Sequence, residues 1–255
     1  MVITRRIKVL APRDNRAHKY SHGTVAVIAG SNEYPGAAVL NVGGARRGGA
    51  GYIQYLDLNE LPTDLVLQAY PDVIKKGLKN LEADAWVIGS GAPELPRRFT
   101  MPRSTYLVLD AASILLVRDT RSVFTVITPH EGEFKALGYS VTSAEDRVML
   151  AKQAAQDLNV YVLLKGPRTV IASPTGAVIE DDSGGPELAT AGTGDVLAGF
   201  LASMLASWKP SSENEMLAVL EKAVRAHGLA GKRAQKKYRP MTALDLLNEL
   251  PKVIS

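Results

Sequence analysis

The sequence predicts an α/β fold in which a central, mostly parallel sheet lies between two layers of helices. Short apolar, β-branched segments alternate along the chain with helical patterns, which is typical of βαβ units. These segments are apolar throughout, as expected for strands that are covered on both faces. Polar and glycine-rich turns follow most of them, and in such sheets the turns after the strands form the ligand site.

The composition of the chain excludes several classes of protein and of functional site. The chain has 255 residues, of which 46% are hydrophobic and 22% charged, so it is not intrinsically disordered. The absence of cysteine excludes disulfides, thiolate metal sites and cysteine nucleophiles. A net charge of +4 is too weak for a typical nucleic-acid binder and suits a small anionic substrate. We expect one domain over 1–255, since no repeat, low-complexity tract or linker stands out. We expect it to be cytoplasmic, since no secretory or membrane-spanning pattern is visible.

The elements follow in order from apolar runs and their boundaries. Strands are expected at 24–29, 52–56, 85–88, 105–109, 123–127, 160–164 and 168–172. Helices are expected at 36–47, 143–158, 194–208 and 213–236, with a short last helix that Thr242 caps. Ser143 is the expected cap of the second of these helices, because Asp146 follows three positions later.

The most informative segment is Gly192-Thr193-Gly194-Asp195. The two glycines can adopt positive φ and let a phosphate approach the backbone. A helix that begins at Asp195 would point its free N–H groups at that phosphate and favour the ionised carboxylate. Asp195 could then accept a proton from a hydroxyl that attacks a phosphoryl group. The alternative is that Asp195 is only the N-cap of a helix after a glycine turn.

Two further segments carry chemistry with weaker specificity. After the strand at 123–127, His130 could bind a substrate and Glu133 could hold Mg²⁺ through water, although acids are also common at any helix N-terminus. The run Lys165-Gly166-Pro167-Arg168-Thr169 could bind a nucleotide, or it could be an ordinary charged hairpin. The basic segment 13–19 could contact phosphates or be a solvated loop. His227 fits a packed histidine better than a metal ligand. Complete P-loop and dinucleotide fingerprints are absent.

Several motifs together resemble the NAD(P)H-hydrate dehydratase family of the ribokinase-like superfamily. The similarity covers nearly the whole chain and follows its order. The matching segments are His18-Lys19, Gly23, 25–31, 34–38, 49–51, 128–134, Leu164-Lys165-Gly166 with Thr169, 192–199, His227-Gly228, Ala230 and 245–251.

The resemblance implies the ribokinase-like three-layer fold and a repair reaction. The enzyme would phosphorylate the hydroxyl of (S)-NADH or (S)-NADPH hydrate from ADP or ATP with Mg²⁺. Phosphate would then leave, helped by the ring nitrogen, to restore the dihydropyridine. The resemblance also implies a homo-oligomer, with a tetramer as one form, for which an apolar stripe on the 36–47 helix could serve. A fused epimerase domain is not expected, so a separate epimerase would be a functional partner.

The resemblance also assigns roles to matching residues. Asp195 would be the base, and Gly192, Thr193 and Gly194 would hold the transferred phosphoryl group. The nucleotide would contact 165–169 and Gly194. The hydrate would contact Ala38, Gly91, His130 and Asp195, and Glu133 would be linked to magnesium. Each role is carried over only to a residue of this sequence that matches the family motif.

Four positions depart from the family pattern. Ala112 replaces the second acid of a usual Asp-Ala-Asp, and Ser90 replaces the proline of a usual Gly-Pro-Gly. Ala191 and Tyr20 each stand where glycine is frequent. Two alternatives stay open. The same anion site and aspartate would also serve a small-molecule kinase of the same superfamily, and the lost carboxylate raises the alternative of a nucleotide-binding module without catalysis.

Overall fold

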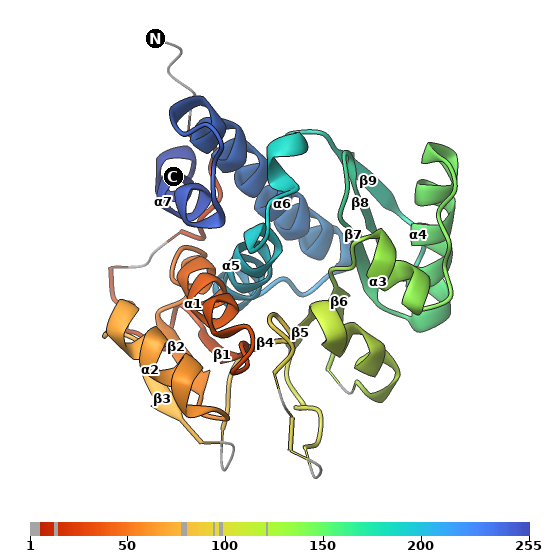
Figure 1. Cartoon of the computed structure of the whole chain (residues 1–255). Helices are drawn as coiled ribbons and strands as arrows, with labels where there is room; N and C mark the ends of the chain where they lie inside the picture. Colours follow the sequence, from red (N-terminus) through yellow and green to blue (C-terminus); the bar gives the residue numbers. More distant parts are fainter. Residues whose placement is uncertain (1–5, 13–14, 78–80, 94, 97–98, 121) are drawn as a thin grey trace.

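A mixed sheet of nine strands runs through the centre of the molecule in the computed structural model, with the order β3-β2-β1-β4-β5-β6-β7-β8-β9 (Figure 1). The structure describes residues 6–12, 15–77, 81–93, 95–96, 99–120 and 122–255. The strands are β1 Thr24–Ile28, β2 Tyr52–Leu56, β3 Ile74–Lys76, β4 Ala85–Ile88, β5 Tyr106–Leu109, β6 Phe124–Ile127, β7 Tyr161–Leu164, β8 Thr169–Ala172 and β9 Val178–Asp181. Neighbouring strands are parallel from β3 to β7, and β8 and β9 are antiparallel additions. The mostly parallel sheet is thus confirmed.

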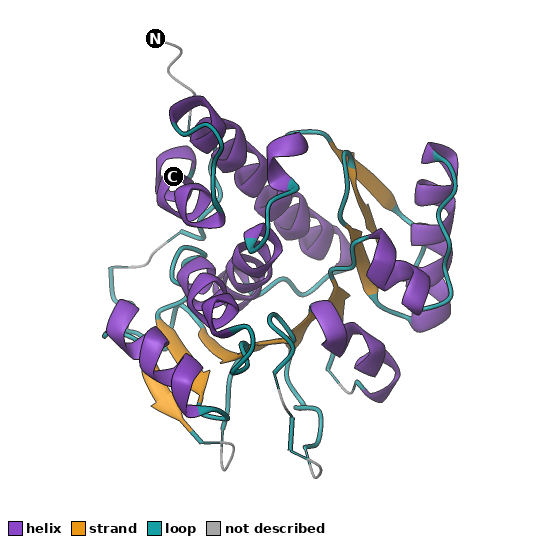
Figure 2. Cartoon of the chain, in the orientation of Figure 1, coloured by secondary structure: helices purple, strands orange, loops and turns teal. Residues whose placement is uncertain are grey.

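Helices cover both faces of this sheet (Figure 2). They are α1 Pro35–Ala45, α2 Glu60–Ala69, α3 Glu131–Ala136, α4 Ala144–Leu158, α5 Thr193–Trp208, α6 Glu213–Lys237 and α7 Ala243–Val253, with 3₁₀ helices at Ala111–Asp119 and Pro186–Leu188. Ser143 and Thr242 accept hydrogen bonds from the third residues of α4 and α7, as expected of N-caps.

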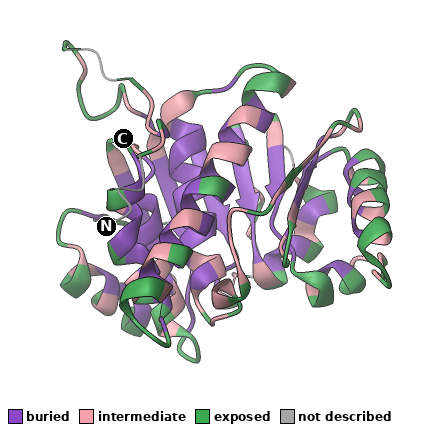
Figure 3. Ribbon diagram, turned by 90° about the horizontal axis from the view of Figure 1, so that it is seen from above, coloured by how far each residue is buried: buried purple, intermediate pink, exposed green. Residues whose placement is uncertain are grey.

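The strands separate two apolar cores because successive side chains point to opposite faces. Val25 and Val27 of β1 pack with α1, α5, α6 and α7, whereas Ala26 and Ile28 pack with α3 and α4. Burial is concentrated around the sheet and the helices against it, and the outer surfaces of the peripheral helices are exposed (Figure 3). This arrangement fixes the carboxyl ends of β4 to β7 beside the beginning of α5.

Three expectations about elements need correction. The helix expected to begin at 194 or 195 begins at Thr193, so Asp195 is its third residue. The edge strands β3 and β9 were not anticipated, because all three residues of β3 are exposed and polar lysines dominate it. The apolar stripe expected on the 36–47 helix is not exposed: α1 buries Ala38, Val42 and Ala45, and only Gly36 is exposed.

Within the part of the chain that the structure describes, no helix has both the length and the apolar character needed to cross a membrane.

Candidate active site

A cavity of about 680 Å³ opens at the carboxyl edge of the sheet. Its walls come from the ends of β5, β6 and β7, the segment between β9 and α5, the first turn of α5, and α6. The lining residues are Asp110, Ala111, His130, Glu133, Lys165, Gly166, Pro167, Thr169, Asp181, Gly184, Gly185, Pro186, Leu188, Ala189, Thr190, Gly192, Thr193, Gly194, Asp195, Leu197, Val224, His227 and Gly228. Its size and position are typical of a small-ligand site in an open α/β sheet.

The first turn of α5 has the geometry of an anion site. Gly192 is its N-cap, with φ of 89°, a conformation that L side chains rarely adopt. Gly194 does not have positive φ and lies within the helix, contrary to expectation. Among the described residues, no acceptor binds the backbone N–H of Gly194 or Asp195. These two donors and the positive end of the helix dipole therefore face the cavity and can hold a phosphate.

Two buried contacts fix this turn. The Thr193 hydroxyl donates to the carbonyl oxygens of Leu188 and Thr190, at 2.8 and 2.9 Å. His227 of α6 places Nε2 2.8 Å from the Thr193 carbonyl oxygen. Burial lowers the pKa of His227 to about 4, so the ring is neutral at pH 7 and its Nε2–H donates to that oxygen. His227 is a packed positioning histidine, as its sequence context indicates.

The position of Asp195 at the helix start had suggested an ionised carboxylate, and the structure does not agree. Burial and the negative charge of Asp110 raise the pKa of Asp195 to about 7, against the opposing effects of Lys165 and Ser90. A carboxyl group with a pKa near the working pH is suited to accept and release a proton. The general-base role of Asp195 stays a prediction with which this pKa is compatible.

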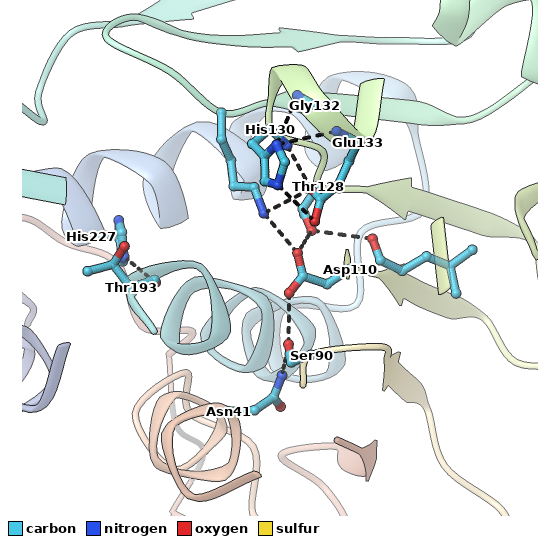
Figure 4. Close-up of polar contacts among 11 residues, drawn as sticks. Asn41, Ser90, Asp110, Thr128, His130, Gly132, Glu133, Thr193 and His227 are labelled. Carbon is cyan, nitrogen blue, oxygen red and sulfur yellow. Dashed lines mark hydrogen bonds and ion pairs between the residues drawn. The ribbon is translucent and has the colours of Figure 1, made fainter. Parts of the chain in front are cut away.

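A charged network that is centred on Asp110 crosses the strand ends (Figure 4). The carboxylate of Asp110 accepts hydrogen bonds from Lys165 at 2.9 Å, Thr128 at 2.8 Å and Ser90 at 2.8 Å. Ser90 in turn accepts from the amide of Asn41 at 2.9 Å. Burial raises the pKa of Asp110, but the charge and hydrogen bond of Lys165 outweigh it and lower that pKa overall. Asp110 and Lys165 are thus both charged inside the site.

The segment after β6 places two predicted residues on the cavity wall. His130 is the N-cap of α3 and its Nδ1 accepts from the N–H of Gly132 at 2.9 Å, while Glu133 accepts from the His130 N–H at 2.8 Å. Because Nδ1 is an acceptor, the proton of the neutral ring lies on Nε2. Glu133 also lies 3.7 Å from the Lys165 ammonium. Both side chains are consequently oriented before a ligand arrives.

The 165–169 segment is the turn between antiparallel β7 and β8. Lys165, Gly166, Pro167 and Thr169 line the cavity. Arg168 is outside the lining and pairs with Glu180 of β9 at 3.4 Å. The turn approaches the α5 start: a Cβ added at Gly194 would lie 3.4 Å from the Lys165 ammonium. Lys165 and Gly194, which are 29 positions apart in the sequence, thus share one site.

Two residues predicted for the substrate lie outside this lining. Ala38 is fully buried in α1, and Gly91 lies after β4 with φ of 71°, against Ala37 and the Gly30 backbone. Ser90, the neighbour of Gly91, is also outside the lining but donates to Asp110, which lines the cavity. The substrate role of both residues stays a prediction.

The structure also places Ala112 and part of the basic segment 13–19. Ala112 is exposed and does not line the cavity, so the family's second acid would have stood on the surface here. In the basic segment 13–19, residues 13 and 14 lie outside the described residues, and the Lys19 ammonium lies 4.9 Å from the centre of the Tyr20 ring. Asn41 and Asp181 were not singled out in the sequence, and Ser90 was noted only as a departure from the family pattern, because nothing local marks the partners of these side chains.

The described residues of the site do not form a metal cage of their own. Across the described ranges, no three His, Cys, Asp or Glu residues are grouped as metal ligands. Mg²⁺ commonly keeps several waters and binds substrate phosphates with one or two carboxylates. Glu133, with its side chain 20% exposed on the cavity wall, fits that limited role.

Comparisons with known proteins agree with this architecture. The family model of NAD(P)H-hydrate dehydratase matches residues 25–252. A bifunctional NAD(P)H-hydrate repair enzyme Nnr from Gloeobacter violaceus is 40% identical over 243 residues, which cover 86% of this chain and 46% of that protein. The Nnr enzyme of Mycobacterium tuberculosis is 37% identical, with 83% and 46% covered. The chain therefore spans about half the length of these curated relatives.

Solved structures share the fold. The ADP/ATP-dependent NAD(P)H-hydrate dehydratase of Bacillus subtilis, crystallised with ATP and Mg²⁺, superposes with a TM-score of 0.79 at 27% identity, over 95% of this chain and 92% of that one. A ribokinase-like protein from Enterococcus faecalis gives a TM-score of 0.78 at 24% identity, over 94% and 89% of the two chains, and supports the fold alone. With a family model that matches most of its length, this chain belongs to the NAD(P)H-hydrate dehydratase family.

Proposed function

We propose that this chain dehydrates NADH or NADPH hydrate to the reduced nicotinamide nucleotide, with ADP or ATP as the phosphoryl donor. The observation that carries the proposal is one arrangement: the free N–H groups of Gly194 and Asp195, the carboxyl of Asp195 with a pKa of about 7, and the Lys165 ammonium, all on one cavity. The B. subtilis relative was crystallised with ATP and Mg²⁺, which supports an adenine nucleotide here.

The first step is phosphoryl transfer. The Asp195 carboxylate takes the proton of the hydrate hydroxyl as that oxygen attacks the terminal phosphorus of the nucleotide. A new P–O bond forms and the bond to the nucleotide breaks, which releases AMP from ADP or ADP from ATP. The N–H groups of Gly194 and Asp195 stabilise the equatorial oxygens of the transferred group, and Lys165 adds a positive charge.

The second step is elimination. The C–O bond of the phosphorylated hydrate breaks, and phosphate leaves with the bonding electrons as the ring nitrogen donates its lone pair. An adjacent ring carbon then loses a proton to water, and the double bond returns. Phosphorylation converts hydroxide, a poor leaving group, into phosphate. The α5 start that binds the group during transfer can also stabilise the departing dianion.

The remaining residues would bind and orient. We assign 165–169 to the nucleotide, and His130, Ala38 and Gly91 to the hydrate. Bound Mg²⁺ would neutralise phosphate charge, with Glu133 as its water-mediated protein contact. The proposal extends to a cytoplasmic homo-oligomer that acts on the S form of the hydrate, which an epimerase activity would supply.

The test is an assay of purified protein with Mg²⁺, NADH hydrate or NADPH hydrate, and ADP or ATP. We expect recovery of the reduced-nicotinamide absorbance with equimolar release of phosphate. Failure to recover absorbance with every combination would overturn the proposal. A stable phosphorylated alcohol in place of free phosphate would indicate a kinase, and nucleotide binding without turnover would indicate a non-catalytic module.

A further inference from the structure

Arg147 lies beneath the 165–168 turn, although its element, α4, does not line the cavity. Its side chain is only 10% exposed. The Nη2 group donates to the carbonyl oxygens of Leu164, Lys165 and Arg168, at 3.4, 3.2 and 3.4 Å. One guanidinium therefore contacts the turn at its beginning and at its end.

The turn rests directly on this guanidinium because Gly166 has no side chain. A Cβ added at Gly166 would lie 2.3 Å from Nη2 of Arg147. The exposed face of Gly166 lines the cavity, so the guanidinium supports the backbone from the opposite side. The position of the turn thus depends on the group below it.

Arg147 also contacts a second segment of the cavity wall. Its Nη1 group forms an ion pair with Glu131, the first residue of α3. His130 and Glu133, which lie close to Glu131 in the sequence, line the cavity together with Gly166 and Pro167. The same side chain is therefore bonded to the turn and to the start of α3.

We propose that Arg147 is a positioning residue that fixes the 165–168 turn against the start of α3 and thereby sets the affinity for the nucleotide phosphate and sugar. The inference rests on the proposed function, because it takes an adenine nucleotide as the ligand of this turn. Arginine suits the role better than lysine, since its planar fork can donate to a carboxylate and several carbonyls together. The ion pair with Glu131, whose side chain is 54% exposed, contributes little net stability, so the geometry of the turn is the better reason for burying the guanidinium.

The experiment measures binding of ADP and of ATP with Mg²⁺ by calorimetry, independently of hydrate turnover. The variants are Arg147→Met, Arg147→Lys and Glu131→Ala, and the control is Lys152→Met, which removes an exposed positive charge from the same helix. We expect Arg147→Met to weaken binding about tenfold, the effect of losing roughly one charge-assisted hydrogen bond. Arg147→Lys should recover part of the loss, and Lys152→Met should bind like the wild type.

A purely structural role predicts a different result. It would lower the unfolding midpoint of Arg147→Met while the folded protein kept wild-type affinity, and that outcome would overturn the inference. In the hydrate assay we expect KM for the nucleotide to rise while KM for the hydrate stays constant. If Arg147→Met does not fold, the Glu131→Ala variant tests the inference, because the Glu131 side chain is 54% exposed and its loss should not prevent folding. We expect this variant to bind the nucleotide about threefold more weakly. Unchanged binding would reject the inference. A wild type that binds neither nucleotide would instead reject the proposed function, and the inference with it.

Discussion

Two aspartates at the same edge of the sheet have opposite acid–base properties. Asp110 is the more buried, with 2% of its surface exposed, yet its pKa is lower than normal. Asp195 is only partly buried, and its pKa rises to about 7. Burial disfavours the charged form of both carboxylates, so burial alone cannot account for the difference.

The difference lies in the donors that surround each carboxylate. Asp110 receives hydrogen bonds from the Lys165 ammonium, Thr128 and Ser90, whereas Asp195 faces the cavity and the negative charge of Asp110. The pair shows how one site separates two carboxylates into two roles. Asp110 is a permanent anion that holds Lys165, and Asp195 is a group that can change its protonation near neutral pH.

The largest expected effect comes from removing the proton acceptor. Asp195→Asn keeps the side-chain size but cannot take the hydroxyl proton, so we expect turnover to fall about 10²- to 10⁴-fold. Hydrate-repair kinetics measure the loss, and nucleotide calorimetry on the same variant serves as the control for an intact site. A variant with near-wild-type turnover would reject Asp195 as the base.

The second effect tests Asp110 as a structural anion. Asp110→Asn leaves the Lys165 ammonium buried without its carboxylate, so we expect the free energy of unfolding to fall by about 3 kcal/mol. Urea denaturation at pH 7 measures this change. Lys165→Met should cost a similar amount, and the double variant should lose less than the sum of the two. Additive losses would show that the two groups do not act as a pair.

The contrast between the two aspartates also shows which features can be predicted from the sequence and which cannot. The strands 85–88 and 52–56 match β4 and β2, because β-branched runs that end at Gly or polar residues give clear local patterns. The caps Ser143 and Thr242 are equally local. The exposed edge strands β3 and β9 lack such a pattern, since they are defined by the neighbour with which they pair.

For the site, the sequence located Lys165, Glu133 and Asp195 through turns at strand ends, and the fold brings them to one cavity. It could not show that Asp110 pairs with Lys165, because 55 residues separate the two. The pKa of Asp195 depends on that pairing and on burial, which are tertiary properties. The same reason hid Arg147, whose contacts are mainly with backbone carbonyl oxygens.

A third effect concerns stability as a function of pH. The pKa of Asp195 rises on folding from an ordinary value of 3.8 to about 7, so ionising it opposes folding as pH increases through this range. The asparagine side chain of the Asp195→Asn variant does not ionise, so its folding carries no such cost. One pKa unit corresponds to about 1.4 kcal/mol, and partial exposure reduces the total, so we expect Asp195→Asn to be about 2 kcal/mol more stable than wild type at pH 8.

Urea denaturation of both proteins at pH 4.5 and at pH 8 measures this difference. The stability gain of the variant should be small at pH 4.5, where the folded wild type keeps the proton, and should reach its full size above pH 7. A gain that is independent of pH would mean that Asp195 does not titrate in this window.

The smallest effect addresses the hydroxyl that lies between the two aspartates. Ser90 is fully buried, donates to Asp110 and accepts from Asn41, and its hydroxyl lowers the pKa of both carboxyl groups. Ser90→Ala should cost about 1 kcal/mol of unfolding free energy, because the buried Asn41 amide loses its acceptor. It should also move the acidic limb of the kcat/KM profile to higher pH, since Asp195 then holds its proton more tightly.

Ser203→Ala is a matched control. Ser203 is equally buried and accepts from the Ala50 N–H at 3.0 Å, but it lies in the middle of α5, away from the cavity lining. We expect a comparable loss of stability with no change in the pH profile. If both variants kept the wild-type limb, Ser90 would be a packing residue alone. A shift in Ser90→Ala only would show that this position, where the family pattern usually has proline, helps to set the difference between the two carboxyl groups.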